Sequence, residues 1–217
     1  MPRAIVVLGG PIAESGSPRW THPVVPREGD IVICADSGAE RARRLGLVPS
    51  VILGDLDSIP SDLLAEAEAE GIPVIKYPVD KDHTDAELAM AHAEESSAEN
   101  VLVLATSTGQ QSHWIGALAA AGASAERQPQ QRWEVRTSDT RFRWATTGSV
   151  LELTLDPHQE FSVLPDTDSM VISIEGGQWN LAQERIERGS CRGVHNRCLG
   201  EVVRVTSHAG RALVVTP

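Results

Sequence analysis

The fold is decided by the stretch Val51–Leu88, VILGDLDSIPSDLLAEAEAEGIPVIKYPVDKDHTDAEL, which alternates short apolar runs with longer amphipathic ones. Val51–Leu53 and Val74–Ile75 are typical of short buried strands. Ser61–Glu70, closed by a glycine, and Thr84–Glu95 are typical of helices. Strands that alternate with helices in this way predict an α/β fold with a parallel sheet.

An acidic cluster follows each apolar run of this stretch, at Gly54–Ser58 and at Lys81–Asp85. Side chains alternate along a strand, so Asp55 and Asp57 are expected to point the same way while Leu56 points into the fold. Two carboxylates on one face repel each other unless a cation lies between them. Hard oxygen ligands of this kind suit Mg²⁺, which binds one or two carboxylates together with phosphate oxygens.

Local structure offers a simpler explanation of each cluster. Asp57-Ser58 before Pro60 is typical of a turn. The spacing Thr84-x-x-Glu87 is typical of a helix capping box, as is Ser37-x-x-Glu40 upstream. The occurrence of both acidic clusters at strand ends favours a ligand site, because ligands of open α/β sheets bind at the carboxyl ends of the strands.

The two clusters also carry a family resemblance. Gly-Asp-x-Asp-Ser followed by Lys-Asp-x-Thr-Asp resembles the thiamine pyrophosphokinase family, and Ala35–Arg41 resembles that family's Ala-Asp-Gly-Gly-Ala-Asn-Arg segment. The resemblance implies an enzyme that uses Mg²⁺ and ATP to convert thiamine into thiamine diphosphate, with release of AMP. It also implies a homodimer that binds thiamine between the first domain of one chain and the second domain of the other.

The resemblance assigns roles to individual residues of this chain. It implies that Asp55, Asp57 and Asp85 hold Mg²⁺, with Asp36 and Asp82 nearby, and that one carboxylate accepts the hydroxyl proton. Lys81 would neutralise charge on the transferred group. The remaining expected contacts are those of Ser58, Thr84, Gly109 and His113 on the nucleotide side, and those of Trp179, His195 and Asn196 with thiamine.

Three later segments bear on the acceptor substrate. Thr108–His113 keeps a glycine and a histidine of the family's Gly-Gly-Arg-x-Asp-His motif but lacks its Arg and Asp. Gly176–Leu181 resembles the family's Gly-Leu-Lys-Trp-x-Leu segment, whereas His195-Asn196-Arg197 stands where the family has Ser-Asn-Glu. These departures leave two alternatives open: a related pyrophosphokinase for another hydroxymethyl acceptor such as a pterin, and a non-catalytic nucleotide- or thiamine-binding relative.

The rest of the chain predicts two domains. Further strand-like runs at Ala4–Leu8, Asp30–Cys34 and Asn100–Ala105 complete a doubly wound parallel sheet, and a polar connection is expected at 122–131. We place an α/β catalytic domain that binds ATP and Mg²⁺ at 1–126, and a thiamine-binding antiparallel β-sandwich at 127–217. The β-like runs assigned to the sandwich are 132–137, 141–145, 150–155, 161–164, 170–174, 202–206 and 212–215.

Composition limits the possible partners and setting. Thirty acidic and 19 basic residues give a formal net charge of −11, which argues against nucleic-acid and anionic-membrane surfaces. The three cysteines and the absence of a long apolar run favour a cytoplasmic protein with reduced thiols. Cys191, His195 and Cys198 match no common zinc spacing, so a turn explains them better. Residues 16–28, polar and rich in proline, are predicted to be a loop.

Overall fold

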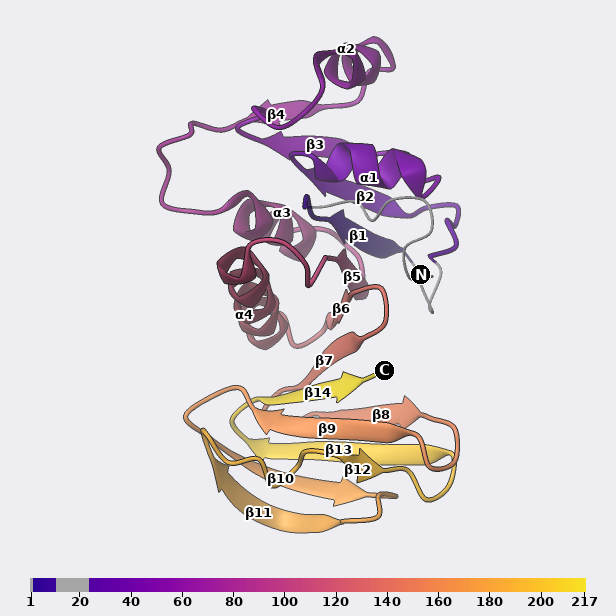
Figure 1. The fold of residues 1–217 in the computed structure, drawn as a ribbon, viewed down its shortest axis with the longest axis vertical. Coiled ribbons are helices and arrows are strands. Elements are labelled where there is room, and N and C mark those ends of the chain that lie inside the picture. Colours follow the sequence, from indigo (N-terminus) through magenta and orange to yellow (C-terminus); the bar gives the residue numbers. More distant parts are fainter. Residues whose placement is uncertain (1, 11–23) are drawn as a thin grey trace. The chain divides into compact units, whose positions relative to one another are not determined.

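The structure is a computed structural model in which we describe residues 2–10 and 24–217 (Figure 1). The predicted loop at 16–28 lies mostly outside the described residues. The chain forms two compact units. The first contains the residues up to Ser124 together with Gln130–Asp139, and the second contains Ala125–Pro129 together with Thr140–Pro217.

The first unit is built on a parallel sheet whose strand order is β6-β5-β1-β2-β3-β4. The strand order reverses between β1 and β5, which makes this pair the topological switch point of the sheet. The strands are β1 (Arg3–Val7), β2 (Ile31–Ala35), β3 (Val51–Gly54), β4 (Val74–Lys76), β5 (Asn100–Leu104) and β6 (Arg132–Arg136).

Helices cover both faces of this sheet, which explains why its strands are continuous apolar runs. Ile5 and Val7 of β1 belong to a core cluster that also contains buried residues of the helices α1 and α2. Ala4 and Val6, which point to the other face, are also fully buried, and α3 contacts β1, β2 and β3. The helices are α1 (Gly38–Arg44), α2 (Ser61–Ala69), α3 (Asp85–Glu94) and α4 (Gln111–Arg127).

Capping was predicted correctly for α3 and incorrectly for α1. Thr84 forms the predicted capping box with Glu87. Ser37 precedes α1 but makes no side-chain cap, because its own backbone is already helical (φ −57°, ψ −6°). At the other end of α1, Gly46 has the left-handed φ of 70° that commonly ends a helix.

Two expectations for residues 122–137 were wrong. The polar connection expected at 122–131 is helical as far as Arg127, because its alanines continue the helix pattern of α4. Strand β6, which the sequence pattern assigns to the sandwich, instead pairs in parallel with β5 and extends the sheet of the first unit. Gln131, just before β6, is 6% exposed and donates its amide to Ala93 O and Glu94 O at the end of α3.

The second unit is an antiparallel β-sandwich, as predicted. Its sheets have the strand orders β12-β9-β14-β7 and β11-β10-β13-β8, and one core cluster contains residues of both sheets. The polar strand β11 and the two-residue β12 were not predicted. The strands are β7 (Arg141–Ala145), β8 (Val150–Thr154), β9 (Glu160–Pro165), β10 (Ser169–Glu175), β11 (Leu181–Glu187), β12 (Asn196–Arg197), β13 (Val202–Ala209) and β14 (Ala212–Thr216).

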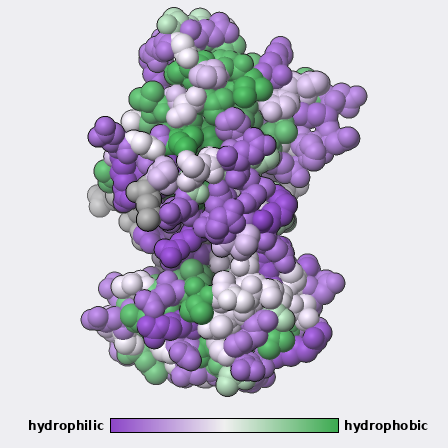
Figure 2. All heavy atoms as spheres, turned by 180° about the vertical axis from the view of Figure 1, so that it is seen from behind, coloured by the Kyte–Doolittle hydropathy of each residue, from purple (hydrophilic) through white to green (hydrophobic). Residues whose placement is uncertain are grey.

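Three of the described tryptophans, Trp133, Trp144 and Trp179, differ clearly in exposure. Trp133 and Trp144 are 4% and 7% exposed, as core residues are expected to be. Trp179 is 54% exposed and is the only aromatic residue among the exposed large hydrophobic side chains of the described part of the chain. The space-filling view shows that other apolar residues also reach the surface (Figure 2). None of the described helices is both long and apolar enough to cross a membrane.

Candidate functional site

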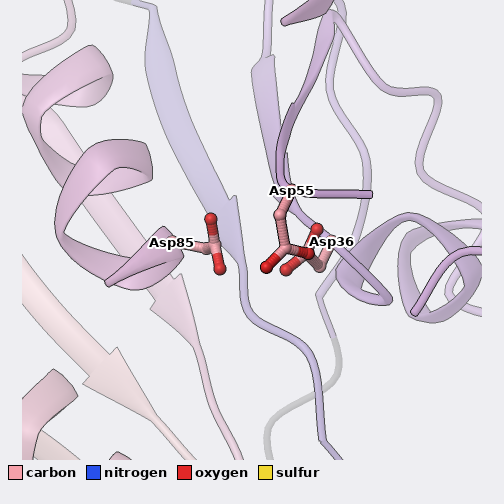
Figure 3. Close-up of side chains that lie close together, drawn as sticks. All are labelled: Asp36, Asp55 and Asp85. Carbon is pink, nitrogen blue, oxygen red and sulfur yellow. The ribbon is translucent and has the colours of Figure 1, made fainter. Parts of the chain in front are cut away.

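Three carboxylates meet at the edge of the parallel sheet where the strands end. Asp36 follows β2, Asp55 follows β3 and Asp85 is the first residue of α3. Figure 3 shows their side chains facing one another. One oxygen of each carboxylate lies within 4.8 Å of the other two. We call Asp36, Asp55 and Asp85 the carboxylate trio; within the described ranges it is the only group of three acidic, histidine or cysteine side chains placed to hold a metal ion.

The backbone around the trio adopts conformations that L-residues rarely take. Asp36 has a φ of 46° and Leu56 a φ of 68°. The Leu56 N–H donates a hydrogen bond to Asp36 Oδ1 at 3.0 Å. A Cβ on Gly54 would lie 2.1 Å from Asp36 Oδ1, so the glycine of the Gly-Asp-x-Asp motif leaves the space that the Asp36 carboxylate occupies. Strained backbone of this kind concentrates at functional sites.

Lys81 supplies positive charge to the trio. Its Nζ lies 3.0 Å from Asp85 Oδ1 and 3.9 Å from Asp55 Oδ2. Desolvation opposes the charged ammonium, but Asp85, Asp55 and Asp36 together raise the pKa of Lys81. Burial raises the pKa of Asp36 to about 7; the hydrogen bond from Leu56 opposes this shift, and the charges of Asp85 and Asp55 add to it. The three crowded carboxylates form the donor set expected for a hard divalent cation.

Asp57 lies beside this group but not in it. Strand β3 ends at Gly54 and Leu56 is left-handed, so the alternation expected for a strand does not continue through 55–57. Asp57 is exposed, and its N–H donates to Asp55 Oδ1 at 3.2 Å. The side-chain hydrogen bond to Asp55 and the nearby negative charge raise the pKa of Asp57. Asp82 is also exposed and lies outside the trio, which therefore contains Asp36 in the place expected for Asp57.

The hydroxyl groups of Ser58 and Thr84 stabilise local structure around the trio. Ser58 Oγ accepts a hydrogen bond from the Ser37 N–H at 3.3 Å. Thr84 Oγ1 accepts the Glu87 N–H at 3.2 Å, and the Glu87 carboxylate in turn accepts the Thr84 N–H at 2.8 Å. Both residues therefore fix turns that carry members of the trio, and their predicted nucleotide contacts remain predictions.

Gly109 and His113 lie at the connection between β5 and α4. Gly109 has a φ of 92°, which suits its place in the turn before the helix. His113 lies in the first turn of α4 and is exposed. Their connection starts at the carboxyl end of β5, the same edge of the sheet at which the trio lies.

Arg41 at the switch point was not identified from the sequence. It is 8% exposed, and its guanidinium donates to Ala105 O at 2.9 Å and to Leu8 O and Leu104 O, each at 3.4 Å. Burial lowers its pKa to about 10. The side chain thus joins α1 to the carboxyl ends of β1 and β5. A charged residue in the otherwise buried face of α1 was the signal that could have revealed it.

The three residues expected to bind thiamine lie in the second unit. Trp179 is largely exposed, whereas Asn196 is 2% exposed and hydrogen-bonds to the Trp179 backbone. His195 has a left-handed φ of 59°, and its Nδ1 lies 3.5 Å from a Glu160 carboxylate oxygen. Glu160 also pairs with Arg197 at 3.1 Å, and the hydrogen bonds from Arg197 and His195 lower the pKa of Glu160.

The comparisons with known proteins agree with this arrangement. Bacillus subtilis thiamine pyrophosphokinase has a similar structure, with a TM-score of 0.81 and 17% identity over 100% of this chain and 98% of that chain. The thiamin pyrophosphokinase of Geobacillus thermodenitrificans has a TM-score of 0.77 and 20% identity over 100% of this chain and 97% of that chain. The thiamin pyrophosphokinase of Candida albicans has a TM-score of 0.74 and 15% identity over 98% of this chain and 88% of that chain.

No curated protein matches the sequence. Residues 25–130, which contain the whole carboxylate trio and Lys81, match the family model described as "Thiamin pyrophosphokinase, catalytic domain". The family resemblance found in the sequence is therefore confirmed: residues 25–130 belong to the thiamin pyrophosphokinase catalytic-domain family, and the chain has the fold of these solved structures.

Proposed function

We propose that this protein is a thiamine pyrophosphokinase, which transfers the pyrophosphoryl group of ATP to the hydroxyl of thiamine and produces thiamine diphosphate and AMP. The observation that carries the proposal is the carboxylate trio with Lys81 at the strand edge of a domain that matches this family's catalytic domain. A site of this kind binds an anionic polyphosphate through a metal ion that is coordinated by both the carboxylates and the phosphate oxygens.

Under this proposal Asp36, Asp55 and Asp85 hold Mg²⁺, and Asp57 is a fourth, exposed carboxylate whose N–H bonds to Asp55. When bound, Mg²⁺ supplies positive charge that neutralises the phosphate oxygens. The donor set supports this assignment, because carboxylate oxygens are the ligands that Mg²⁺ prefers. The trio replaces the originally expected set of Asp55, Asp57 and Asp85.

The protein's own part in the transfer is positioning and charge neutralisation, as in phosphoryl transfer generally. Lys81 directs an ammonium at the same place as Asp55 and Asp85, where it can neutralise charge on the transferred group. Asp57 or Asp82, which are exposed and outside the trio, would accept the proton of the attacking hydroxyl. Ser58 and Thr84 keep the two acidic loops in shape.

The acceptor is thiamine in this proposal, although Arg197 stands where the family has Glu. A lone arginine would repel a cationic substrate. Arg197 is paired with Glu160 across the β9–β12 ladder, so its charge is locally balanced. Trp179 adds an exposed indole face, which attracts flat and cationic rings. We assign thiamine binding to the second domain and ATP and Mg²⁺ to the first, in a cytoplasmic homodimer as the family resemblance implies.

Release of AMP tests this proposal. Purified protein with ATP and Mg²⁺ should produce AMP when thiamine is added, and AMP release should stop when EDTA removes the metal. A parallel reaction with a hydroxymethylpterin should produce none. AMP release with the pterin alone would identify a related pyrophosphokinase. Calorimetric binding of thiamine or ATP without AMP release would identify a non-catalytic relative.

A further inference from the structure

The turn between β10 and β11 presents the indole of Trp179 to solvent. The turn covers Gly176–Asn180, and its residue Trp179 is 54% exposed. More than half of the surface of Trp179 lacks protein contacts that could fix its direction. The direction of the indole therefore depends on how firmly the backbone of Trp179 is held.

One buried side chain holds both polar backbone groups of Trp179. Asn196 Nδ2 donates to Trp179 O at 2.7 Å, and Asn196 Oδ1 accepts the Trp179 N–H at 3.1 Å. The same oxygen accepts the Arg197 N–H at 2.9 Å. Both lone pairs of the amide oxygen are thus in use. With 2% of its surface exposed, Asn196 serves the Trp179 turn, which leaves little of it for a ligand.

Gly177 makes room for this arrangement. A Cβ at position 177 would lie 2.9 Å from Asn196 Nδ2, 3.0 Å from Asn196 Oδ1 and 3.1 Å from Phe161 Cζ. The Gly177 N–H donates to Asn180 Oδ1 at 3.1 Å, which closes the turn. Any side chain at this position would crowd the Asn196 amide and the Phe161 ring.

We infer that Asn196 is a positioning residue that sets the Trp179 indole as a preformed surface for a flat, cationic heteroaromatic ring. The inference rests on the proposed function, in which that ring is part of thiamine, and it replaces the direct contact expected for Asn196. A residue already held in place loses less conformational freedom when the ligand binds. Asn196 therefore affects ligand affinity only through Trp179.

A double-mutant cycle tests this inference. Thiamine affinity is measured by calorimetry for the full-length wild type, Trp179→Ala, Asn196→Ala and the double variant. We expect Trp179→Ala to weaken binding about 5- to 30-fold. We expect Asn196→Ala to weaken it several-fold, and the double variant to bind no more weakly than Trp179→Ala alone. Non-additivity of this kind is the mark of residues that act together.

Two further variants separate positioning from general stability. Gly177→Ala leaves Asn196 chemically intact but crowds its amide, so it should weaken thiamine binding as Asn196→Ala is expected to. It keeps the inference testable if Asn196→Ala does not fold. Ser207→Ala is the matched control, because Ser207 is also fully buried in this unit but donates to Gly210 O at 2.7 Å. It should lower the melting temperature while leaving thiamine affinity unchanged.

The outcomes distinguish this inference from the proposed function. Additive losses in the cycle, or wild-type affinity in folded Asn196→Ala and Gly177→Ala, would overturn the positioning role while thiamine binding by the wild type stands. A Trp179→Ala variant that binds thiamine as the wild type does would overturn it too. A wild-type protein that neither binds thiamine nor releases AMP would refute the proposed function, and the positioning role with it.

Discussion

The two units hold their candidate site residues in opposite ways. In the first unit, three carboxylates share a space beside the ammonium of Lys81, and the pKa of Asp36 rises to about 7 as a result of burial and of its acidic neighbours. In the second unit, the buried amide of Asn196 has its oxygen fully bonded and holds Trp179 in place. Under the proposed function, ligand binding should therefore relieve repulsion in the first unit, whereas the residues proposed to bind thiamine in the second unit are already held in place.

The largest expected effect separates activity from stability at the trio. Asp36→Asn keeps the Oδ1 acceptor for the Leu56 N–H but removes the charge. We expect AMP release to fall by about 100-fold or more, the usual scale for losing one preorganised electrostatic contact. The free energy of unfolding of the metal-free protein, measured by urea titration in EDTA, should stay the same or rise. Asp62→Asn, an exposed carboxylate change on α2, should affect neither quantity.

The pH dependence of the same variant sharpens this test. Because the pKa of Asp36 is raised from 3.8 to about 7, the folded protein binds an extra proton between these two pH values. The ionised Asp36 therefore lowers the stability of the wild type only as the pH rises above about 4. The stability advantage of Asp36→Asn in EDTA should be absent near pH 4, grow as the pH rises, and be complete above about pH 7. An advantage that grows instead as the pH falls would contradict the repulsion that we infer at the trio.

A second test concerns the backbone that shapes the trio. In Gly54→Ala the new methyl group would collide with the Asp36 carboxylate, and a φ of 146° is strained for alanine. We expect the free energy of unfolding to fall by about 2–4 kcal/mol. Gly46→Ala, where a Cβ meets nothing within 4 Å, is the matched control and should cost about 1 kcal/mol. Equal losses in the two variants would show that Gly54 is needed only for its backbone conformation.

In the second unit the expected effect is smaller and concerns affinity. Trp179→Ala should cost about 1–2 kcal/mol of thiamine binding, because a desolvated stacking or cation–π contact is worth that much. ATP affinity should hardly change. Leu199→Ala, which removes another exposed apolar side chain of this unit, should leave both affinities unchanged. A sharp drop in melting temperature with thiamine affinity preserved would mean that Trp179 serves the sandwich instead.

The smallest expected effect belongs to Thr84. Thr84→Ala removes the cap of α3, so the free energy of unfolding should fall by about 1 kcal/mol. Thr84→Ser, which keeps the hydroxyl, should restore most of that stability. If Thr84 also contacts the nucleotide, KM for ATP will rise in the alanine variant at temperatures where it is fully folded. An unchanged KM would limit Thr84 to its role as a cap.

Local patterns in the sequence predicted the fold of the first unit well. Strands buried on both faces must be continuous apolar runs, and the Thr84 capping box depends on residues only three positions apart. Strand β6 could not be placed in this way, because Arg132–Arg136 alternates polar and apolar residues as a sandwich strand does. Its parallel partner β5 is a long-range choice that no local pattern encodes.

Local patterns also indicated where the candidate site lies, but not which side chains meet there. The sequence identified all three members of the trio, since each follows a strand or opens a helix. The family resemblance named Asp57 as a ligand and Asp36 as a neighbour, whereas the structure groups Asp36 with Asp55 and Asp85, because β3 ends at Gly54 and the expected alternation does not continue to Asp57. It assigned Asn196 to the ligand, although the amide bonds to the Trp179 backbone. Burial and left-handed turns determine where the side chains of Asp57 and Asn196 lie, and neither property can be read from residue types alone.

Lys81 has a consequence for the form in which a metal ion can enter the proposed site. Its ammonium is covalently attached to the loop that it neutralises, so it competes with a free divalent ion at a high effective concentration that dilution cannot reduce. A metal–nucleotide complex brings phosphate anions that can take over this ammonium. A bare metal ion carries no anion that could pair with the displaced Lys81 ammonium. If the trio holds Mg²⁺ as proposed, Lys81 would thereby favour binding of the metal–nucleotide complex over binding of the bare metal ion.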